Sequence, residues 1–181
     1  MIRIRESKET ELETVLSVEL DAFHNDPEIR TLVQDLFMDE SAKPIISLLA
    51  FDGDEAVGHV YFSAATIDDC GADVMTMLLA PLAVRPSHQK KGIGQQLIYA
   101  AFEKAAQIGV KVIFVLGHPT YYPHCGFVPA GVKGFLAPYP IPEENANAWM
   151  MHELQAGVLA GLNGGTVRCA SSLMKPQYWR E

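Results

Sequence analysis

The chain has 181 residues, of which 49% are hydrophobic, so it can bury one sizeable core. We therefore expect a single domain spanning residues 1–181. The formal net charge of −8 disfavours binding to nucleic acid and favours cationic or amine-bearing partners.

The cysteines and the apolar runs predict the cellular compartment of the protein. Cys70, Cys125 and Cys169 are odd in number and lack a Cys-x-x-Cys spacing, which argues against a disulfide framework or a zinc ribbon. No apolar run reaches the roughly 18 residues of a membrane span, and the first residues lack the apolar segment of a signal peptide. We expect a soluble, cytoplasmic protein with reduced thiols and no membrane partner.

The first 40 residues predict one strand and two helices. Ile2 and Ile4 alternate with arginines, which is the period of a half-buried strand. Ser7 is expected to cap the first helix, because apolar residues then recur at helical intervals. A second helix is expected to begin near Pro27 and to end before Ser41.

The next segment predicts a hairpin followed by a long strand. Residues 44–51 and 56–65 are apolar, and the Asp-Gly of residues 52–55 between them is typical of a tight hairpin turn. A turn at residues 68–71 leads into an apolar run that ends at Val84. Pro81 lies within this run and cannot donate to a ladder, so we expect a bulge, a parting of strands or an edge there.

The segment after Val84 predicts a site for an anion. A polar loop carries Gly92 and Gly94, and residues 97–108 show helical spacing up to Gly109, which has the place of a C-terminal cap. Glycines at a helix start let a ligand approach the backbone, and the first N–H groups of the helix attract negative charge. The buried strand expected at residues 110–116 would then lie parallel to the strand before the loop.

Two motifs in this region resemble one protein family. The loop Gln89-Lys90-Lys91-Gly92-Ile93-Gly94 fits the pattern Gln/Arg-x-x-Gly-x-Gly/Ala and follows Leu82-Ala83-Val84-Arg85-Pro86. Residues 112–130 form a second segment with the element Tyr-x-x-x-Gly-Phe, in which Tyr122 precedes Gly126-Phe127. Together they resemble the acetyl-CoA loop and the fifth-strand segment of the GNAT N-acetyltransferase superfamily. The glycine spacings of a Rossmann fingerprint and of a P-loop are not met.

The resemblance implies a fold and a cosubstrate. The expected fold is α/β (α+β), with a mixed, mostly antiparallel central sheet flanked by helices and a splay between strands at the acetyl-CoA site. Acetyl-CoA is the implied cosubstrate, and no metal is expected. The residues expected to contact acetyl-CoA are Leu82, Ala83, Val84, Gln89, Lys90, Lys91, Gly92, Ile93, Gly94 and Gln95.

The resemblance also implies a proton donor. Tyr122 has the position of the family's general acid, with Tyr121 as a rival and a packed aromatic residue as the plain alternative. Many members of the family carry a glutamate on the strand before the glycine loop, but residues 75–84 contain no carboxylate, so the general base stays open. The candidates for the base are His118, Glu19, Asp21 and Asp26. His118 and His124 lack a third ligand for a metal.

The last third of the chain is less regular. Residues 131–147 contain several prolines and predict an ordered loop that forms part of an acceptor pocket. A strand is expected over residues 149–154 by resemblance, then a turn near residues 157–165 and a final strand from Thr166 to Leu173.

These features predict transfer of an acetyl group from acetyl-CoA to a primary amine by direct attack in a ternary complex. The alternatives are a non-catalytic acyl-CoA-binding or sensing module and a nucleotide-phosphate enzyme. The acceptor is expected to be a small-molecule or peptide amine, and a homodimer is left open. A positively charged acceptor is favoured by an excess of carboxylates in the segments flanking its site, namely Glu19, Asp21, Asp26, Glu28, Asp35, Asp39, Glu40, Glu143 and Glu144 against Arg30 and Lys133.

Overall fold

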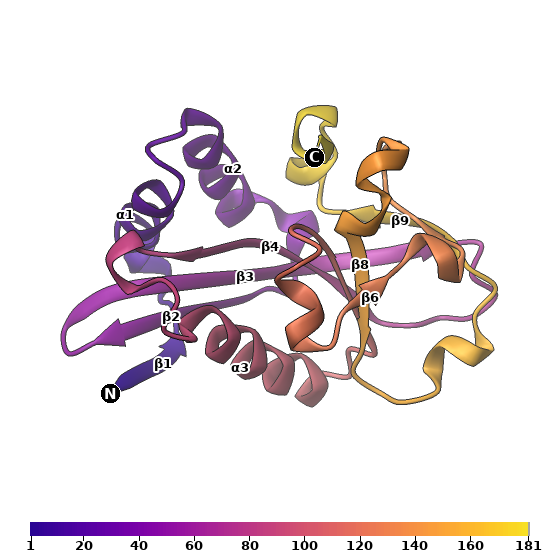
Figure 1. The fold of residues 1–181 in the computed structure, drawn as a ribbon, viewed down its shortest axis with the longest axis horizontal. Helices are drawn as coiled ribbons and strands as arrows, with labels where there is room; N and C mark the ends of the chain where they lie inside the picture. Colours follow the sequence, from indigo (N-terminus) through magenta and orange to yellow (C-terminus); the bar gives the residue numbers. More distant parts are fainter. Residues whose placement is uncertain (181) are drawn as a thin grey trace.

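The computed structural model describes residues 1–180, which form one mixed sheet with helices on both faces (Figure 1). The strands lie in the order β1 (Ile2–Glu6), β2 (Ile46–Asp52), β3 (Glu55–Asp68), β4 (Thr76–Val84), β5 (Val112–Leu116), β8 (Trp149–Glu153) and β6 (Val128–Pro129). Strand β9 (Gly165–Cys169) pairs with the end of β3, and β7 (Phe135–Leu136) pairs with β9. Within the described chain, β4–β5 and β7–β9 are parallel and the other pairs are antiparallel. The expected mixed, mostly antiparallel sheet is confirmed.

Among residues 1–180, three α-helices cover the two faces of the sheet. Helices α1 (Leu12–Ala22) and α2 (Pro27–Met38) lie on one face, and α3 (Ile93–Gln107) lies on the opposite face (Figure 1). Short 3-10 turns connect these elements at Glu9–Glu11, Glu40–Ala42, Pro86–His88, Tyr122–Cys125, Gly131–Lys133, Glu143–Ala148, Val158–Gly161, Ser171–Leu173 and Pro176–Trp179.

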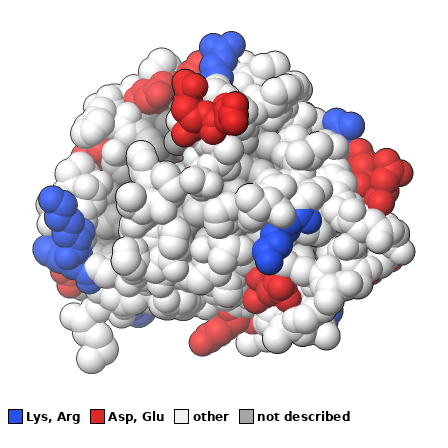
Figure 2. Space-filling view, turned by 45° about the vertical axis from the view of Figure 1, so that its right-hand side comes forward, with Lys and Arg blue, Asp and Glu red and all other residues white. Residues whose placement is uncertain are grey.

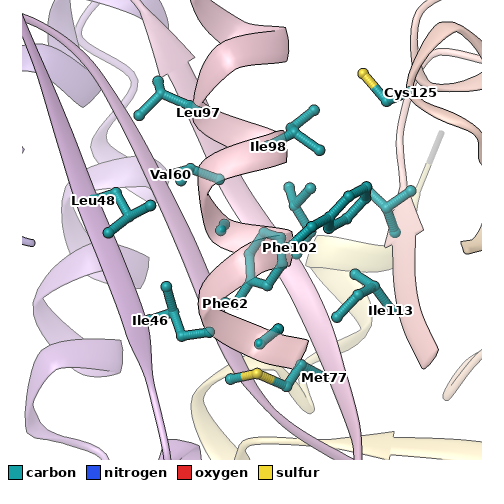
Figure 3. Close-up of a cluster of buried hydrophobic side chains, with 14 of the residues drawn as sticks. Ile46, Leu48, Val60, Phe62, Met77, Leu97, Ile98, Phe102, Ile113 and Cys125 are labelled. Carbon is teal, nitrogen blue, oxygen red and sulfur yellow. The ribbon is translucent and has the colours of Figure 1, made fainter. Parts of the chain in front are cut away.

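Helix α3 is held in place by an apolar core. Leu97 and Ile98 are fully buried, and Phe102 packs beside them against the sheet (Figure 3). The sheet contributes side chains from β2 to β5, namely Ile46, Leu48, Val60, Phe62, Met77 and Ile113. Each buried side chain of this size contributes about 1.5–3 kcal/mol to stability relative to exposure. This packing fixes the start of α3 beside the end of β4.

The first half of the chain mostly follows its prediction. Strands β2 and β3 form the expected hairpin, with Gly53 at a φ of 59° in the turn. Helix α2 begins at Pro27, and the carboxylate of Asp26 accepts a hydrogen bond from the Glu28 backbone N–H. The predicted cap at Ser7 is wrong. Ser7 instead continues the pairing of β1, because its N–H and its hydroxyl both bond to Ser47.

The last third follows its prediction in part. Strand β8 is confirmed, and the loop of residues 131–147 contains the short strand β7. The final strand ends at Cys169 and not at Leu173. It ends there because Ser171 and Ser172 turn toward α2, where their backbone N–H groups donate to Ser41 and Asp39.

The Asp39 carboxylate joins α2 to the C-terminal segment and predicts a pH-dependent stability. Burial raises the pKa of this carboxyl, but hydrogen bonds from Ser172 and Ser41 outweigh burial and lower the pKa to about 2. Because the folded-state pKa lies below the ordinary value of 3.8 for an aspartate, the stabilisation is present at neutral pH and is lost as the pH falls toward 2.

We expect Asp39→Ala to lower the free energy of unfolding at pH 7 by about 1–3 kcal/mol, because two serine N–H groups lose their acceptor. The difference from the wild type should shrink between about pH 4 and pH 2 in thermal melts. Glu40→Ala is the matched control, because Glu40 pairs with Lys43 at the exposed surface and should contribute less than about 1 kcal/mol. An equal effect of both substitutions would contradict the assignment.

Candidate functional site

Strands β4 and β5 part midway along the sheet. Their parallel pairing ends at Leu79 and Val115, although β4 continues to Val84. The register between β3 and β4 shifts opposite Pro81, which has no N–H to donate. The bulge and the parting of strands expected at Pro81 therefore both occur. They leave one edge of β4 without a β5 partner beyond Leu79.

A cavity of about 650 Å³ lies at this open edge, between the end of β4 and the start of α3. Its walls come from β4, the glycine loop, the first residues of α3 and the segment that follows β5. The residues that line it are Leu82, Val84, His88, Gln89, Lys90, Gly92, Ile93, Gly94, Gln95, His118, Tyr121 and Tyr122.

The glycine loop is shaped by two left-handed residues and two side-chain bonds. Gly92 caps α3 with a φ of 78°, and Lys90 has a φ of 60°. Gln89 Nε2 donates to the carbonyl of Val84 at 3.0 Å, and Lys91 Nζ donates to the carbonyl of Ser87 at 3.1 Å. The loop therefore presents the start of α3 to the cavity. The N–H groups of that first turn lack intrahelical acceptors, which suits an anion.

Gly94 lies in the first turn of α3, next to the Tyr121 side chain. A Cβ at this position would overlap the hydroxyl oxygen of Tyr121. The absence of a side chain at Gly94 thus lets Tyr121 and the helix start come together at the cavity wall. Burial raises the pKa of the Tyr121 phenol to about 12.

Tyr122 lies deeper than Tyr121. Its side chain is 9% exposed, and a Cβ at Gly117 would overlap its ring. The ring makes edge contacts with Tyr121 and Phe127, at centroid distances of 5.2 and 5.5 Å. These contacts hold Tyr122 in the 3-10 turn Tyr122–Cys125, where it lines the cavity.

The structure brings most of the predicted contact residues into one wall. Two of the predicted residues do not line the cavity. The Ala83 side chain is buried against α1, and the Lys91 side chain donates to a carbonyl within the loop. Ala83 therefore offers only its backbone to a ligand at this edge. Sequence reasoning missed His88, which lines the cavity and lies 3.5 Å from an Asp52 carboxylate oxygen. Its place directly before the glycine-loop motif is the signal that could have identified it.

The four candidates for the base lie in different surroundings. Glu19 is fully buried, with Oε1 2.5 Å from His59 Nδ1, so it does not face the cavity. Asp21 forms an ion pair with Arg85 at 3.0 Å, and Asp26 caps α2. His118 is exposed and lines the cavity. It is the one of the four that the structure places beside Tyr122.

The predicted acidic rim is smaller than the sequence indicates. Glu19 is wrong as a rim residue, because its side chain is fully buried. Asp35 pairs with Lys175 at 3.1 Å, which compensates its charge. Figure 2 shows Asp and Glu in separate groups, with Lys and Arg between them, around a broad uncharged area. Five of the predicted rim carboxylates have no ion pair among the described residues, namely Asp26, Glu28, Asp39, Glu143 and Glu144.

Residues 1–180 contain neither a cluster of potential metal ligands nor a helix that could span a membrane. No three His, Cys, Asp or Glu side chains are grouped so that they could hold a metal ion. None of the described helices is long and apolar enough to cross a membrane.

The cavity fits coenzyme A by its own features. An anion site at the start of α3 suits a pyrophosphate, and the unpaired edge of β4 suits an extended amide-containing arm. The fold leads to the same class of protein. The structure resembles a crystal structure of the GNAT-family N-acetyltransferase YhbS from Escherichia coli in complex with CoA, with a TM-score of 0.84, 25% identity and coverage of 96% of this chain and 92% of that one.

Further comparisons agree on the class. A Brucella melitensis GNAT-family acetyltransferase in complex with acetyl-CoA shares the fold, with a TM-score of 0.71, 21% identity and coverage of 96% and 98% of the two chains. The chain is 47% identical to the uncharacterized N-acetyltransferase YjhQ of Escherichia coli K12 over 140 residues, which cover 77% of this chain and 76% of YjhQ. The cavity and these relatives define an acetyl-CoA-dependent acetyltransferase.

The family model described as acetyltransferase (GNAT) family matches residues 9–127. The chain belongs to the GNAT acetyltransferase family. The resemblance inferred from the glycine loop and the Tyr-x-x-x-Gly-Phe element is thereby confirmed, and so is acetyl-CoA as the cosubstrate.

Proposed function

We propose that this protein transfers an acetyl group from acetyl-CoA to a primary amine that attacks the thioester directly in a ternary complex. The observation that carries the proposal is that one cavity joins the anion site of α3 to His118, Tyr121 and Tyr122. Binding groups and proton-transfer groups thus share one wall. A module that only bound acyl-CoA would need the first set and not the second.

The binding roles follow from the backbone. The first N–H groups of α3, from Ile93 to Gln95, would hold the pyrophosphate, with Lys90 adding positive charge. The free edge of β4 at Leu82 and Val84 would pair with the pantetheine arm as an added strand would. When bound, acetyl-CoA supplies a thioester carbonyl that is open to attack by an amine.

Two side chains would move protons. The amine must lose a proton, because an alkylammonium with a pKa near 10 is about one part in a thousand neutral at pH 7. His118 lines the cavity at the end of β5 and would accept that proton. Tyr122 would donate a proton to the departing thiolate. Both are residues of the segment from β5 to the turn Tyr122–Cys125.

His118→Gln tests the base. We expect kcat to fall by about tenfold, because water can replace an exposed base in part, while the Kd for acetyl-CoA stays within about twofold. His124→Gln is the matched control, because His124 is an exposed histidine of the same segment that does not line the cavity. Equal rates for His118→Gln and the wild type at every pH would exclude His118 as the base.

We further propose that the acceptor is a primary amine with net positive charge, supported by the carboxylates that remain unpaired on the acceptor side. An amine panel separates the classes, with thiol release from acetyl-CoA as the readout at low and at moderate salt. Polyamines, amino sugars and peptide lysines should be acetylated faster than glutamate or a phosphorylated amine, and their advantage should fall as salt rises. A preference for the acidic amines would contradict the proposal.

The rival functions have their own test. In a thermal shift experiment, a ligand at 100 times its Kd adds about 2.7 kcal/mol of stability. Acetyl-CoA should raise the Tm, whereas ATP and NAD should not, if the loop is not a nucleotide-phosphate site. Thermal stabilisation by acetyl-CoA without thiol release for any amine would favour the non-catalytic module.

A further inference from the structure

A second set of chemically active side chains lies on the α1 side of the sheet, away from the acetyl-CoA cavity. Glu19 Oε1 of α1 is 2.5 Å from His59 Nδ1 of β3. His59 Nε2 is 2.9 Å from Ser47 Oγ of β2. Ser7, at the end of β1, donates its hydroxyl hydrogen to Ser47 Oγ at 2.6 Å. The order carboxylate, imidazole and serine, with the two imidazole nitrogens facing opposite partners, is the arrangement of a Ser-His-acid triad.

Burial of the Glu19 carboxylate lowers the stability of the fold. Glu19 and His59 are both fully buried, and Glu19 Oε2 has no hydrogen-bond partner among the described residues. An unpaired buried carboxylate oxygen destabilises a fold. A network that served packing alone would be better built from neutral groups of the same size. Burial raises the pKa of the Glu19 carboxyl, and the hydrogen bond with His59 opposes that rise.

The serine end of the group opens into a cavity of about 510 Å³, which Ser7 and Ser47 both line. Part of the wall is apolar, from Leu12, Phe37, Met38, Ile45 and Ile46, and the lining residues other than these and the two serines are charged. Met38 is 81% exposed and adds apolar surface at the rim of the cavity. This cavity and the acetyl-CoA cavity have no lining residue in common.

We propose that Ser47, His59 and Glu19 form a second active site, at which Ser47 is the nucleophile toward carboxylic esters with an apolar acyl chain. The chain would lie along the apolar wall, with the ester carbonyl at Ser47. The proposal does not depend on the acetyltransferase reaction.

The reaction balances with these groups and water. As Ser47 Oγ bonds to the carbonyl carbon, its proton passes to His59 Nε2. When the tetrahedral intermediate collapses, the C–O bond to the alcohol breaks, and the alcohol leaves with the proton from His59. Water, deprotonated by His59, then attacks the acyl-serine and releases a carboxylic acid and the serine. Ser7, the side-chain donor nearest to Ser47, would stabilise the oxyanion.

Glu19 is a positioning residue in this scheme. Its ionised carboxylate would keep the proton of His59 on Nδ1, so that Nε2 can accept from Ser47. Glu19→Gln keeps the shape of the side chain but removes that preference. We therefore expect Glu19→Gln to slow reaction at Ser47 by roughly 100-fold or more, in line with the loss seen when a triad acid becomes an amide.

The test uses a biotin-tagged fluorophosphonate on the full chain, with the modified residue found by peptide mass spectrometry. Ser47 should form a P–O bond as fluoride leaves, and saturating CoA should not protect it. Ser47→Ala should lose this label. Ser63→Ala is the matched control and should keep it, because Ser63 is a buried serine of β3 without a hydrogen-bond partner in the described chain. p-Nitrophenyl butyrate should be hydrolysed faster than the acetate ester, because its longer chain meets the apolar wall.

The outcome in the wild type decides the proposal even if a variant is poorly folded. No label on Ser47 of the folded wild-type protein, or a label that lies on another residue, would show that the group is a structural network. A label on Ser47 that forms as fast in Glu19→Gln as in the wild type would show that Ser47 reacts without help from the triad.

Discussion

Gly94→Val should abolish measurable binding of acetyl-CoA, with a loss of at least about 100-fold in affinity, or about 2.8 kcal/mol. A side chain at this point would stand between the ligand and the first N–H groups of α3, and its Cβ would already overlap the Tyr121 hydroxyl oxygen. The fold should remain cooperative, because Gly94 lies in the first turn of a helix with helical backbone angles. Titration calorimetry measures the affinity, and a thermal melt checks the fold.

A double variant separates the two causes of that loss. In Tyr121→Phe the hydroxyl that meets the new Cβ is gone, whereas Tyr121 Cζ lies at 3.4 Å from the Cβ position, a tight but adjustable contact. If the smaller change Gly94→Ala weakens binding through this clash, Tyr121→Phe should restore most of the affinity. If it weakens binding by blocking the pyrophosphate, the second substitution should restore none. Unchanged affinity in Gly94→Val itself would contradict the placement of the pyrophosphate.

The sequence predicted the cofactor side of the molecule better than the acceptor side, for a physical reason. The glycine loop is local: Gly92 needs a positive φ, and helix α3 starts at the next residue, so both features can be read from adjacent positions. The parting of β4 and β5 was also readable, because Pro81 cannot donate to a ladder. The parallel pairing of β4 and β5 could be predicted because a helix connects the two strands.

Features that depend on distant contacts were missed. Ser7 has the composition of a helix cap, but Ser47, 40 residues later, offers it a sheet partner. Glu19 has the periodicity of an exposed helix residue, and only the fold shows His59 beneath it. Sequence alone counts such carboxylates as surface charge, which is why the acidic rim was overestimated.

The two faces of the sheet also separate two kinds of chemistry. The acetyl-CoA cavity lies where β4 and β5 part, whereas the group of Ser47, His59 and Glu19 lies under α1 toward the β1 edge. Because the two cavities have no residue in common, substitutions at one site are expected to leave the chemistry of the other intact. Variants of the cofactor loop can therefore be used to show that reaction at Ser47 is independent of acetyl-CoA.

Tyr122→Phe should lower kcat by roughly 100-fold or more while the Kd for acetyl-CoA changes little. The phenol would donate its proton to the departing thiolate only in the transition state, so its loss should not weaken ground-state binding. Phenylalanine keeps the ring that packs against Gly117, Tyr121 and Phe127, so the fold should be retained. Single-turnover rates and a thermal melt of each variant provide the two readouts.

Tyr121→Phe is the matched control for Tyr122→Phe, because both rings line the same cavity. Burial raises the pKa of Tyr121 to about 12, which makes it a weaker acid than an ordinary phenol at neutral pH. We expect its loss to lower kcat by less than about tenfold. Similar rate losses in the two variants, or a Tyr122→Phe enzyme that loses thermal stability but keeps its rate, would show that Tyr122 is a packing residue and that the proton comes from another group.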